Sequence, residues 1–222
     1  MVKVTLQIAA WTAIMAAMIL WPAGTLAYPG GRAFIGMFAV GGLAITVWLA
    51  KHNPRLLRER MSSPVQRDQK PWDRIWLSLF ILLCCAWMIF MAWDAARAGF
   101  TAVPAWLQAV GAVLIALYLL GVWWTFRENT FAAPVVKIQE DQRVIDTGPY
   151  AIVRHPMYTS ALLFIVGLPL LLGSWIGLAM SAVFILGIAW RTLHEEGALR
   201  AELKGYDEYA ARVRYRFIPS IW

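Results

Sequence analysis

The chain has 222 residues, of which 60% are hydrophobic, 15% are charged and 13 are tryptophan. This composition excludes an ordinary soluble domain, in which about a quarter of the residues are charged, and predicts an all-α integral membrane protein. The formal net charge of +7 could suggest a nucleic-acid partner. However, the basic residues flank apolar stretches instead of forming a stripe, so we expect membrane lipids as partners and no nucleic acid.

The chain contains five apolar stretches, at about 5–28, 32–50, 75–97, 104–125 and 157–190. Each of the first four has about the ~20 residues that cross ~30 Å of hydrocarbon as a helix. The fifth is too long for one crossing, and Gly167-Leu168-Pro169 and Gly173-Ser174 interrupt it. A hairpin of two short helices, at about 157–172 and 175–193, is therefore expected. The total is about six transmembrane helices.

The basic residues predict the orientation of these helices. With the N-terminus inside and six crossings, 18 of the 20 Lys and Arg residues are cytoplasmic, as the positive-inside rule expects. Both termini and the site described below would then face the cytoplasm, most simply across a bacterial inner membrane. Residues 1–27 have some features of a signal peptide, but their long apolar run favours a retained helix.

The segment from Lys51 to Arg74 is basic and contains Pro54, Pro64 and Pro71. The prolines predict a loop without a long helix. We interpret it as a solvated connection that sets the orientation, with a lid over a site as the alternative.

A polar connector and a charged tail enclose the last hairpin. In the connector, β-type residues lie on both sides of the turn-like Glu140-Asp141, which predicts an extended segment or hairpin across the cytoplasmic mouth; they are Val135, Val136, Ile138, Val144 and Ile145. The tail is expected to continue the last helix into water as a cytoplasmic amphipathic C-terminal helix that caps the site or lies on the membrane. Its apolar stripe consists of Tyr206, Tyr209, Ala210, Val213 and Phe217. We therefore divide the chain into a scaffold, 1–125, and a catalytic region, 126–222.

One polar cluster opens the hairpin, with the sequence Gly148-Pro149-Tyr150-Ala151-Ile152-Val153-Arg154-His155-Pro156-Met157-Tyr158. Pro156 predicts that a helix starts directly after His155. The N-terminus of that helix, together with Arg154 and His155, predicts a subsite for a carboxylate or phosphate. Tyr150 and Tyr158 offer rings that can stack on a purine or attract a cation.

A second polar cluster, Arg191-Thr192-Leu193-His194-Glu195-Glu196, follows the hairpin. Arg191 and Glu195 are four residues apart and share a helix face. Glu196 points elsewhere, and we interpret it first as an exposed ion pair with Arg200. His155, His194, Glu195 and Glu196 are possible metal ligands, but their spacing fixes no geometry, so no metal is expected.

An anion subsite beside a carboxylate with aromatic neighbours suits the carboxylate, sulfonium and adenine of S-adenosylmethionine. A zwitterionic lipid headgroup or an ion path would also suit these residues. No glycine-rich dinucleotide motif follows a strand pattern, so a soluble type of methyltransferase domain is not expected.

The two clusters, followed by Gly205-Tyr206, Tyr209 and Ile218-Pro219, resemble the isoprenylcysteine carboxyl methyltransferase family, which is related to membrane phospholipid methyltransferases. The resemblance covers about residues 126–222. It implies methyl transfer from S-adenosylmethionine to a lipidic or membrane-partitioned acceptor, such as the carboxylate of a prenylated cysteine.

The resemblance also implies roles for individual residues. As catalytic residues, Arg191 would bind the acceptor carboxylate and Glu195 would bind the cofactor. The implied cofactor contacts are Gln142, Val144, Ile145, Tyr150, Arg154, His155, Pro156, Met157, Tyr158, Glu195 and Glu196. Whether Lys137 or Gln139 also contacts the cofactor stays open.

Two other functions remain as alternatives. A more distant resemblance of the tail to membrane sterol reductases keeps an NADPH-dependent reductase open. A non-enzymatic lipid-binding or transport protein would place polar residues throughout the first four helices, where Asp94 is nearly the only one. The sequence fixes neither the acceptor nor the oligomeric state.

Overall fold

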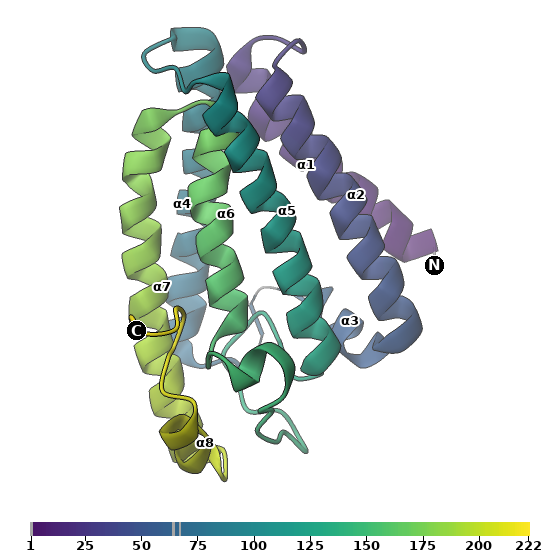
Figure 1. Ribbon diagram of the computed structural model, residues 1–222. Coiled ribbons are helices and arrows are strands. Elements are labelled where there is room, and N and C mark those ends of the chain that lie inside the picture. The colour runs from purple at the N-terminus through teal and green to yellow at the C-terminus, as the bar shows by residue number, and fades with distance from the viewer. Residues whose placement is uncertain (1, 64, 67) are drawn as a thin grey trace.

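The computed structural model describes residues 2–63, 65–66 and 68–222, and within these residues the chain forms helices and no strands. Six helices form the bundle: α1 (Val2–Ala23), α2 (Pro29–His52), α4 (Pro71–Trp93), α5 (Ala105–Glu128), α6 (Pro156–Leu172) and α7 (Trp175–Glu202). α1, α4 and α6 run in one direction and α2, α5 and α7 in the other (Figure 1). A π-helical turn, η1 (Asp94–Ala98), extends α4.

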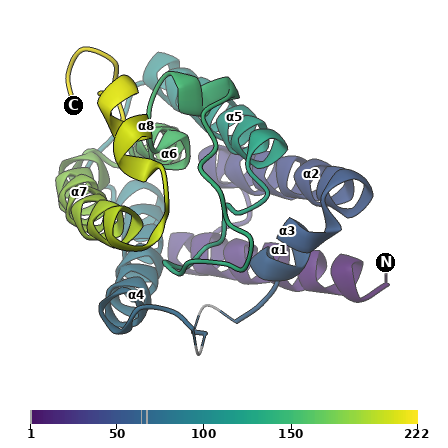
Figure 2. The ribbon, with the colours of Figure 1, turned by 90° about the horizontal axis from the view of Figure 1, so that it is seen from below.

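Shorter elements gather at one end of the bundle, which we call the loop-rich end. They are α3 (Pro54–Arg60), a 3-10 turn η2 (Gly148–Ala151) and α8 (Tyr206–Arg212), together with the connector, residues 129–155. Figure 2 shows the connector crossing this end of the bundle, between α5 and α2 on one side and α4 and α7 on the other.

Five described helices are long and apolar enough to cross a membrane: α1, α2, α4 with η1, α5 and α7. The chain is therefore an integral membrane protein. α6 is also apolar but has 17 residues, and it packs against α5 and α7. The sixth crossing, by α6, stays a prediction.

The predicted hairpin is present, and its turn has a clear local cause. Gly173 ends α6 with φ of 90°, a left-handed conformation that glycine adopts without strain. Ser174 then caps α7, because its hydroxyl accepts a hydrogen bond from the Gly177 N–H. The second helix, however, continues to Glu202, well beyond the predicted end at 193.

Of the two forms predicted for the connector, the structure shows the extended segment and not the hairpin. The connector turns at Gln139–Gln142, and side chains of other elements bind its backbone: Asp73 accepts from Val136 N–H, and Arg191 donates to Pro134 O. The tail contains a C-terminal helix, as predicted, but this helix is not continuous with α7. α7 ends at Glu202, and Gly205, with φ of 85°, separates it from α8.

The apolar stripe predicted for the tail is therefore only partly helical. Tyr206, Tyr209 and Ala210 are buried on α8, whereas Val213 and Phe217 follow the end of that helix. Phe217 is buried all the same, because the irregular chain folds back onto the start of α6, where its carbonyl accepts a hydrogen bond from the Thr159 hydroxyl.

The basic loop is not simply solvated. It contains α3, and Leu56, Leu57 and Gln69 are buried. Since Arg60 and Lys70 line the cavity described below, this loop contributes to the site. Pro64, one of its three prolines, lies outside the described residues.

α5 and α6 pack closely because glycines replace side chains at their contact. A Cβ on Gly111 would lie 2.5 Å from Leu171 N and 2.7 Å from Gly167 O, and a Cβ on Gly167 would lie 3.0 Å from Gly111 O. These positions therefore let the two backbones approach, as small residues do between membrane helices. This contact positions the polar start of α6 beside the end of α5.

We predict that Gly111→Ala lowers the melting temperature of the detergent-purified protein, because the added methyl group meets backbone atoms and costs roughly 1–3 kcal/mol. Gly42→Ala, in α2, is the matched control, since its Cβ would have no heavy atom within 4 Å. Equal melting temperatures for the two variants would contradict the close contact of α5 and α6.

Candidate active site

A cavity lies at the loop-rich end, walled by the connector, the start of α6, the end of α7 and α8. Nearly all of the predicted site residues line it: Gln142, Val144, Ile145, Tyr150, Arg154, His155, Pro156, Met157, Tyr158, Arg191 and Glu195. The turn before α6 and the end of α7 therefore converge, as the spacing of the motifs requires. Glu196 is not among the lining residues.

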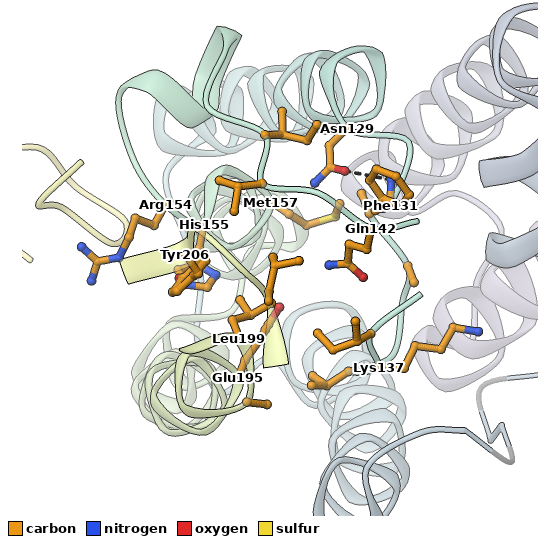
Figure 3. Close-up of a pocket in the computed structure, with 18 of the residues that line it drawn as sticks. Asn129, Phe131, Lys137, Gln142, Arg154, His155, Met157, Glu195, Leu199 and Tyr206 are labelled. Carbon is orange, nitrogen blue, oxygen red and sulfur yellow. Dashed lines mark hydrogen bonds between the residues drawn. The ribbon is translucent and has the colours of Figure 1, made fainter. Parts of the chain in front are cut away.

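Glu195 is held toward the cavity by a chain of hydrogen bonds. Tyr158 Oη donates to Glu195 Oε2 at 2.5 Å, and Arg191 Nη1 donates to Tyr158 Oη at 2.8 Å. Figure 3 shows Glu195 pointing from α7 into the cavity. The carboxylate is thus fixed in position while its side chain stays partly accessible.

The chain of hydrogen bonds ends on Asp73, a residue that we did not predict for the site. Asp73 is fully buried, and its Oδ1 accepts from Arg191 Nε at 2.7 Å. Its Oδ2 accepts from Gln69 Nε2 and from Val136 N–H, both at 2.8 Å. Asp73 therefore joins α4, α7 and the connector. The signal in the sequence that could have identified Asp73 is its position as an acidic residue in the first turn of an apolar helix.

Glu196 occupies a second buried charge cluster, behind the cavity wall. Its Oε1 accepts from Arg154 Nε at 2.7 Å and lies 3.1 Å from His155 Nε2, while Oε2 accepts from Arg216 Nε at 3.1 Å. The side chain is only 4% exposed. Because removing one partner would leave a buried charge uncompensated, this cluster binds α7, the turn before α6 and the tail tightly to one another.

The Glu196 cluster corrects two predictions. Glu196 does not form an exposed pair with Arg200, which instead pairs with Asp207. The anion at Arg154 and His155 is an internal carboxylate, and Arg154 also donates to the carbonyls of Val213 and Arg214. Figure 3 shows Arg154 pointing away from the cavity. The predicted anion subsite is thus filled by the protein itself.

Tyrosines form much of the remaining polar wall. Tyr150 Oη accepts from Asn129 Nδ2 at 2.8 Å, and Tyr209 Oη donates to Tyr150 O at 2.8 Å. Burial raises the pKa of Tyr150 to about 12 and raises the pKa values of Tyr206 and Tyr209 above their usual range. All three therefore stay protonated at neutral pH. Tyr206 Oη is buried and has no hydrogen-bond partner among the described residues.

The unpartnered Tyr206 hydroxyl matters because buried polar groups are almost always hydrogen-bonded. Tyr206 lines the cavity. A ligand group in the cavity that accepts a hydrogen bond would satisfy it.

Both of the residues left open in the connector have partners within the protein, and Lys137 is also among the residues that line the cavity. Lys137 Nζ lies 3.0 Å from Glu59 Oε2 and 2.9 Å from Asp68 Oδ2. Burial would lower the pKa of Lys137, but these carboxylates outweigh it and raise the pKa. Gln139 donates to Phe131 O and is not among the lining residues.

The possible metal ligands do not assemble in the part of the chain that the structure describes. There, no three His, Cys, Asp or Glu side chains lie close enough together to hold an ion. His194 is exposed and packs against Trp190, with ring centroids 3.9 Å apart and the rings tilted by 33°.

Comparison with known families supports a membrane enzyme. Residues 106–203 match the model of the phospholipid methyltransferase family, which contains the isoprenylcysteine carboxyl methyltransferases. The chain matches no curated protein. The family match indicates a membrane methyltransferase, and it covers α5, the connector, α6 and α7, which carry most of the cavity wall.

We predict that substitution of the two neighbouring glutamates affects stability to very different extents. Glu196→Gln removes the charge from a buried cluster, so it should lower the stability of the protein by about 3 kcal/mol and expose the tail to protease. Glu195→Gln, the matched control, should change stability little, because Glu195 has one tyrosine partner and is partly accessible. Thermal unfolding and limited proteolysis of both variants check this. Equal melting temperatures would contradict the structural role of Glu196.

Proposed function

We propose that this chain, whose residues 106–203 match the phospholipid methyltransferase family, transfers a methyl group from S-adenosylmethionine to an acceptor that partitions into the membrane. The observation that carries the proposal is the position of Glu195, fixed by Tyr158 and pointing into a cavity at the polar end of a membrane bundle. A carboxylate with aromatic neighbours is suited to a sulfonium cation.

The other walls of the cavity suit the rest of the cofactor. Val144, Ile145 and Leu199 provide apolar contacts for an adenine ring. The unpartnered Tyr206 hydroxyl is a donor for a cofactor oxygen or nitrogen. These features support binding of S-adenosylmethionine. When bound, this cofactor would supply a methyl group: a lone pair of the acceptor atom forms the new bond to the methyl carbon, the C–S bond breaks, and the sulfonium becomes a thioether.

The residues of the chain would act by positioning. A carboxylate acceptor needs no general base, so the tasks are to align the reactants and to exclude water. Arg191 uses three of its five N–H donors on Asp73, Tyr158 and Pro134. It thereby fixes Tyr158 and Glu195, and its two remaining donors are available for the predicted contact with the acceptor.

We further propose that the loop-rich end faces the cytoplasm. Most basic residues lie in the segments at this end, as the positive-inside rule expects. A water-soluble cofactor would then enter from the cytoplasm, and the acceptor would arrive from the membrane.

The test of this function is thermal stabilisation of the detergent-purified protein by three separate ligands. S-adenosylhomocysteine is expected to raise the melting temperature, because a ligand that binds only the folded state stabilises it. NADPH and zinc are expected to have no effect. Stabilisation by NADPH but not by S-adenosylhomocysteine would instead support the reductase and contradict a methyltransferase.

Glu195→Gln should weaken binding of S-adenosylmethionine about tenfold or more, but binding of S-adenosylhomocysteine much less, since only the former carries the sulfonium charge. Calorimetry with both ligands measures this difference. Glu208→Gln, an exposed acidic position on α8, is the control and should bind both normally. Equal weakening of the two ligands would exclude contact between Glu195 and the sulfonium.

A further inference from the structure

Arg60, at the end of α3, is a half-buried cation without an acidic partner. Its Nε donates to Ala132 O at 3.2 Å, and its Nη2 contacts the Met157 sulfur at 3.0 Å. The guanidinium carbon lies 4.3 Å from the centre of the Phe126 ring. A thioether is a weak acceptor, so an anionic oxygen would be a better partner for Nη2 than the Met157 sulfur.

Arg60 is exceptional among the cations of the cavity wall. The other buried or half-buried ones each meet a carboxylate: Arg191 with Asp73, Arg154 with Glu196, Lys137 with Glu59 and Asp68, and Lys70 with Glu202. Arg143, which also lines the cavity, is exposed to solvent. Among the described residues, no carboxylate lies within ion-pair distance of Arg60.

The charge of Arg60 persists in this environment. Burial lowers its pKa to about 10, so the guanidinium remains protonated at neutral pH. A charge removed from water without an ionic partner is unfavourable, and such a group in the wall of a cavity is a candidate for binding a ligand.

Arg60 also lines two cavities. One is the candidate active site, and the other is an apolar cavity between α1, α2 and α5. Trp11, Phe38, Leu49, Leu57, Tyr118 and Phe126 are among the residues that line this second cavity. Since these helices belong to the membrane bundle, the second cavity is suited to a hydrocarbon chain.

We propose that Arg60 binds the anionic group of a lipid acceptor whose hydrocarbon chain lies in the cavity between α1, α2 and α5. This inference rests on the proposed methyltransferase function. The anionic oxygen would take the position of the Met157 sulfur as the acceptor for Nη2. The polar end of the lipid would thereby lie at the start of α6, beside the cofactor cavity. The anion is a carboxylate or a phosphate diester, and both have the same charge-assisted geometry with arginine.

Two pairs of probes test the proposal, each with matched chains and different charge. N-acetyl-S-farnesyl-cysteine and its carboxamide test a carboxylate, and 1-oleoyl-lysophosphatidylglycerol and 1-oleoylglycerol test a phosphate diester. Binding is measured by thermal shift in a nonionic detergent with wild type, Arg60→Gln, Arg60→Lys and Arg58→Gln. Arg58 is an exposed arginine on the same helix and provides the control.

At least one anionic probe is expected to stabilise the wild type and Arg58→Gln. Its apparent affinity should fall about tenfold or more in Arg60→Gln and less in Arg60→Lys, while the uncharged probes should not distinguish the variants. The probe that shows this dependence identifies the anion as carboxylate or phosphate. Equal affinity of wild type and Arg60→Gln for the anionic probes, or no binding of either anionic probe to the wild type, would overturn the proposal.

Two further measurements distinguish failure of the proposed methyltransferase function from failure of the proposed role of Arg60. Without lipid, Arg60→Gln should be at least as stable as the wild type, because the lost charge has no acidic partner, and loss of folding would contradict that premise. S-adenosylhomocysteine should stabilise Arg60→Gln as it does the wild type, and loss of this stabilisation in Arg60→Gln alone would mean that Arg60 binds the cofactor and would overturn the proposal. If it stabilises neither, the proposed function fails, whereas normal stabilisation together with charge-independent lipid binding rejects only the role of Arg60.

Discussion

Glu196 carries its charge among Arg154, His155 and Arg216, and this buried cluster connects three segments that are distant in the sequence. Without these partners a carboxylate that is 4% exposed would be strongly disfavoured. The tail is consequently held against the start of α6, where the Arg154 and His155 amides also donate to the carbonyls of Tyr215 and Arg216. The position of α8, and with it one wall of the cavity, depends on this cluster.

Two adjacent residues of α7 have different roles, because Glu196 stabilises the structure and Glu195 is available to a ligand. Successive residues on a helix point about 100° apart, so Glu195 points into the cavity while Glu196 points into the cluster behind it. On the other wall of the cavity, the buried Asp73–Arg191 ion pair also has a structural role, since it fixes the connector and orients Tyr158. In both places the buried ion pairs hold the wall, and the groups that they orient remain available to a ligand.

The sequence predicted the membrane helices well because apolar length and Gly or Pro interruptions are local signals, as at Gly173-Ser174. Motif resemblance also brought Tyr158 and Glu195 together correctly. Partners defined only by tertiary packing could not be predicted: Asp73 and Arg191 are 118 positions apart, and Arg60 looks like any other residue of a basic loop. Helix periodicity alone also placed Glu196 beside Arg200, since nothing local indicates that the tail returns to cover it.

An experimental structure of the protein with S-adenosylhomocysteine bound would test the central claim most directly. The account predicts the nucleoside between the connector and the α7–α8 corner, with its sulfur beside Glu195 and Tyr158 and a ligand atom bonded to the Tyr206 hydroxyl. A ligand bound elsewhere, or a structure in which the start of α6 and the Arg191–Glu195 face of α7 lie apart, would contradict it.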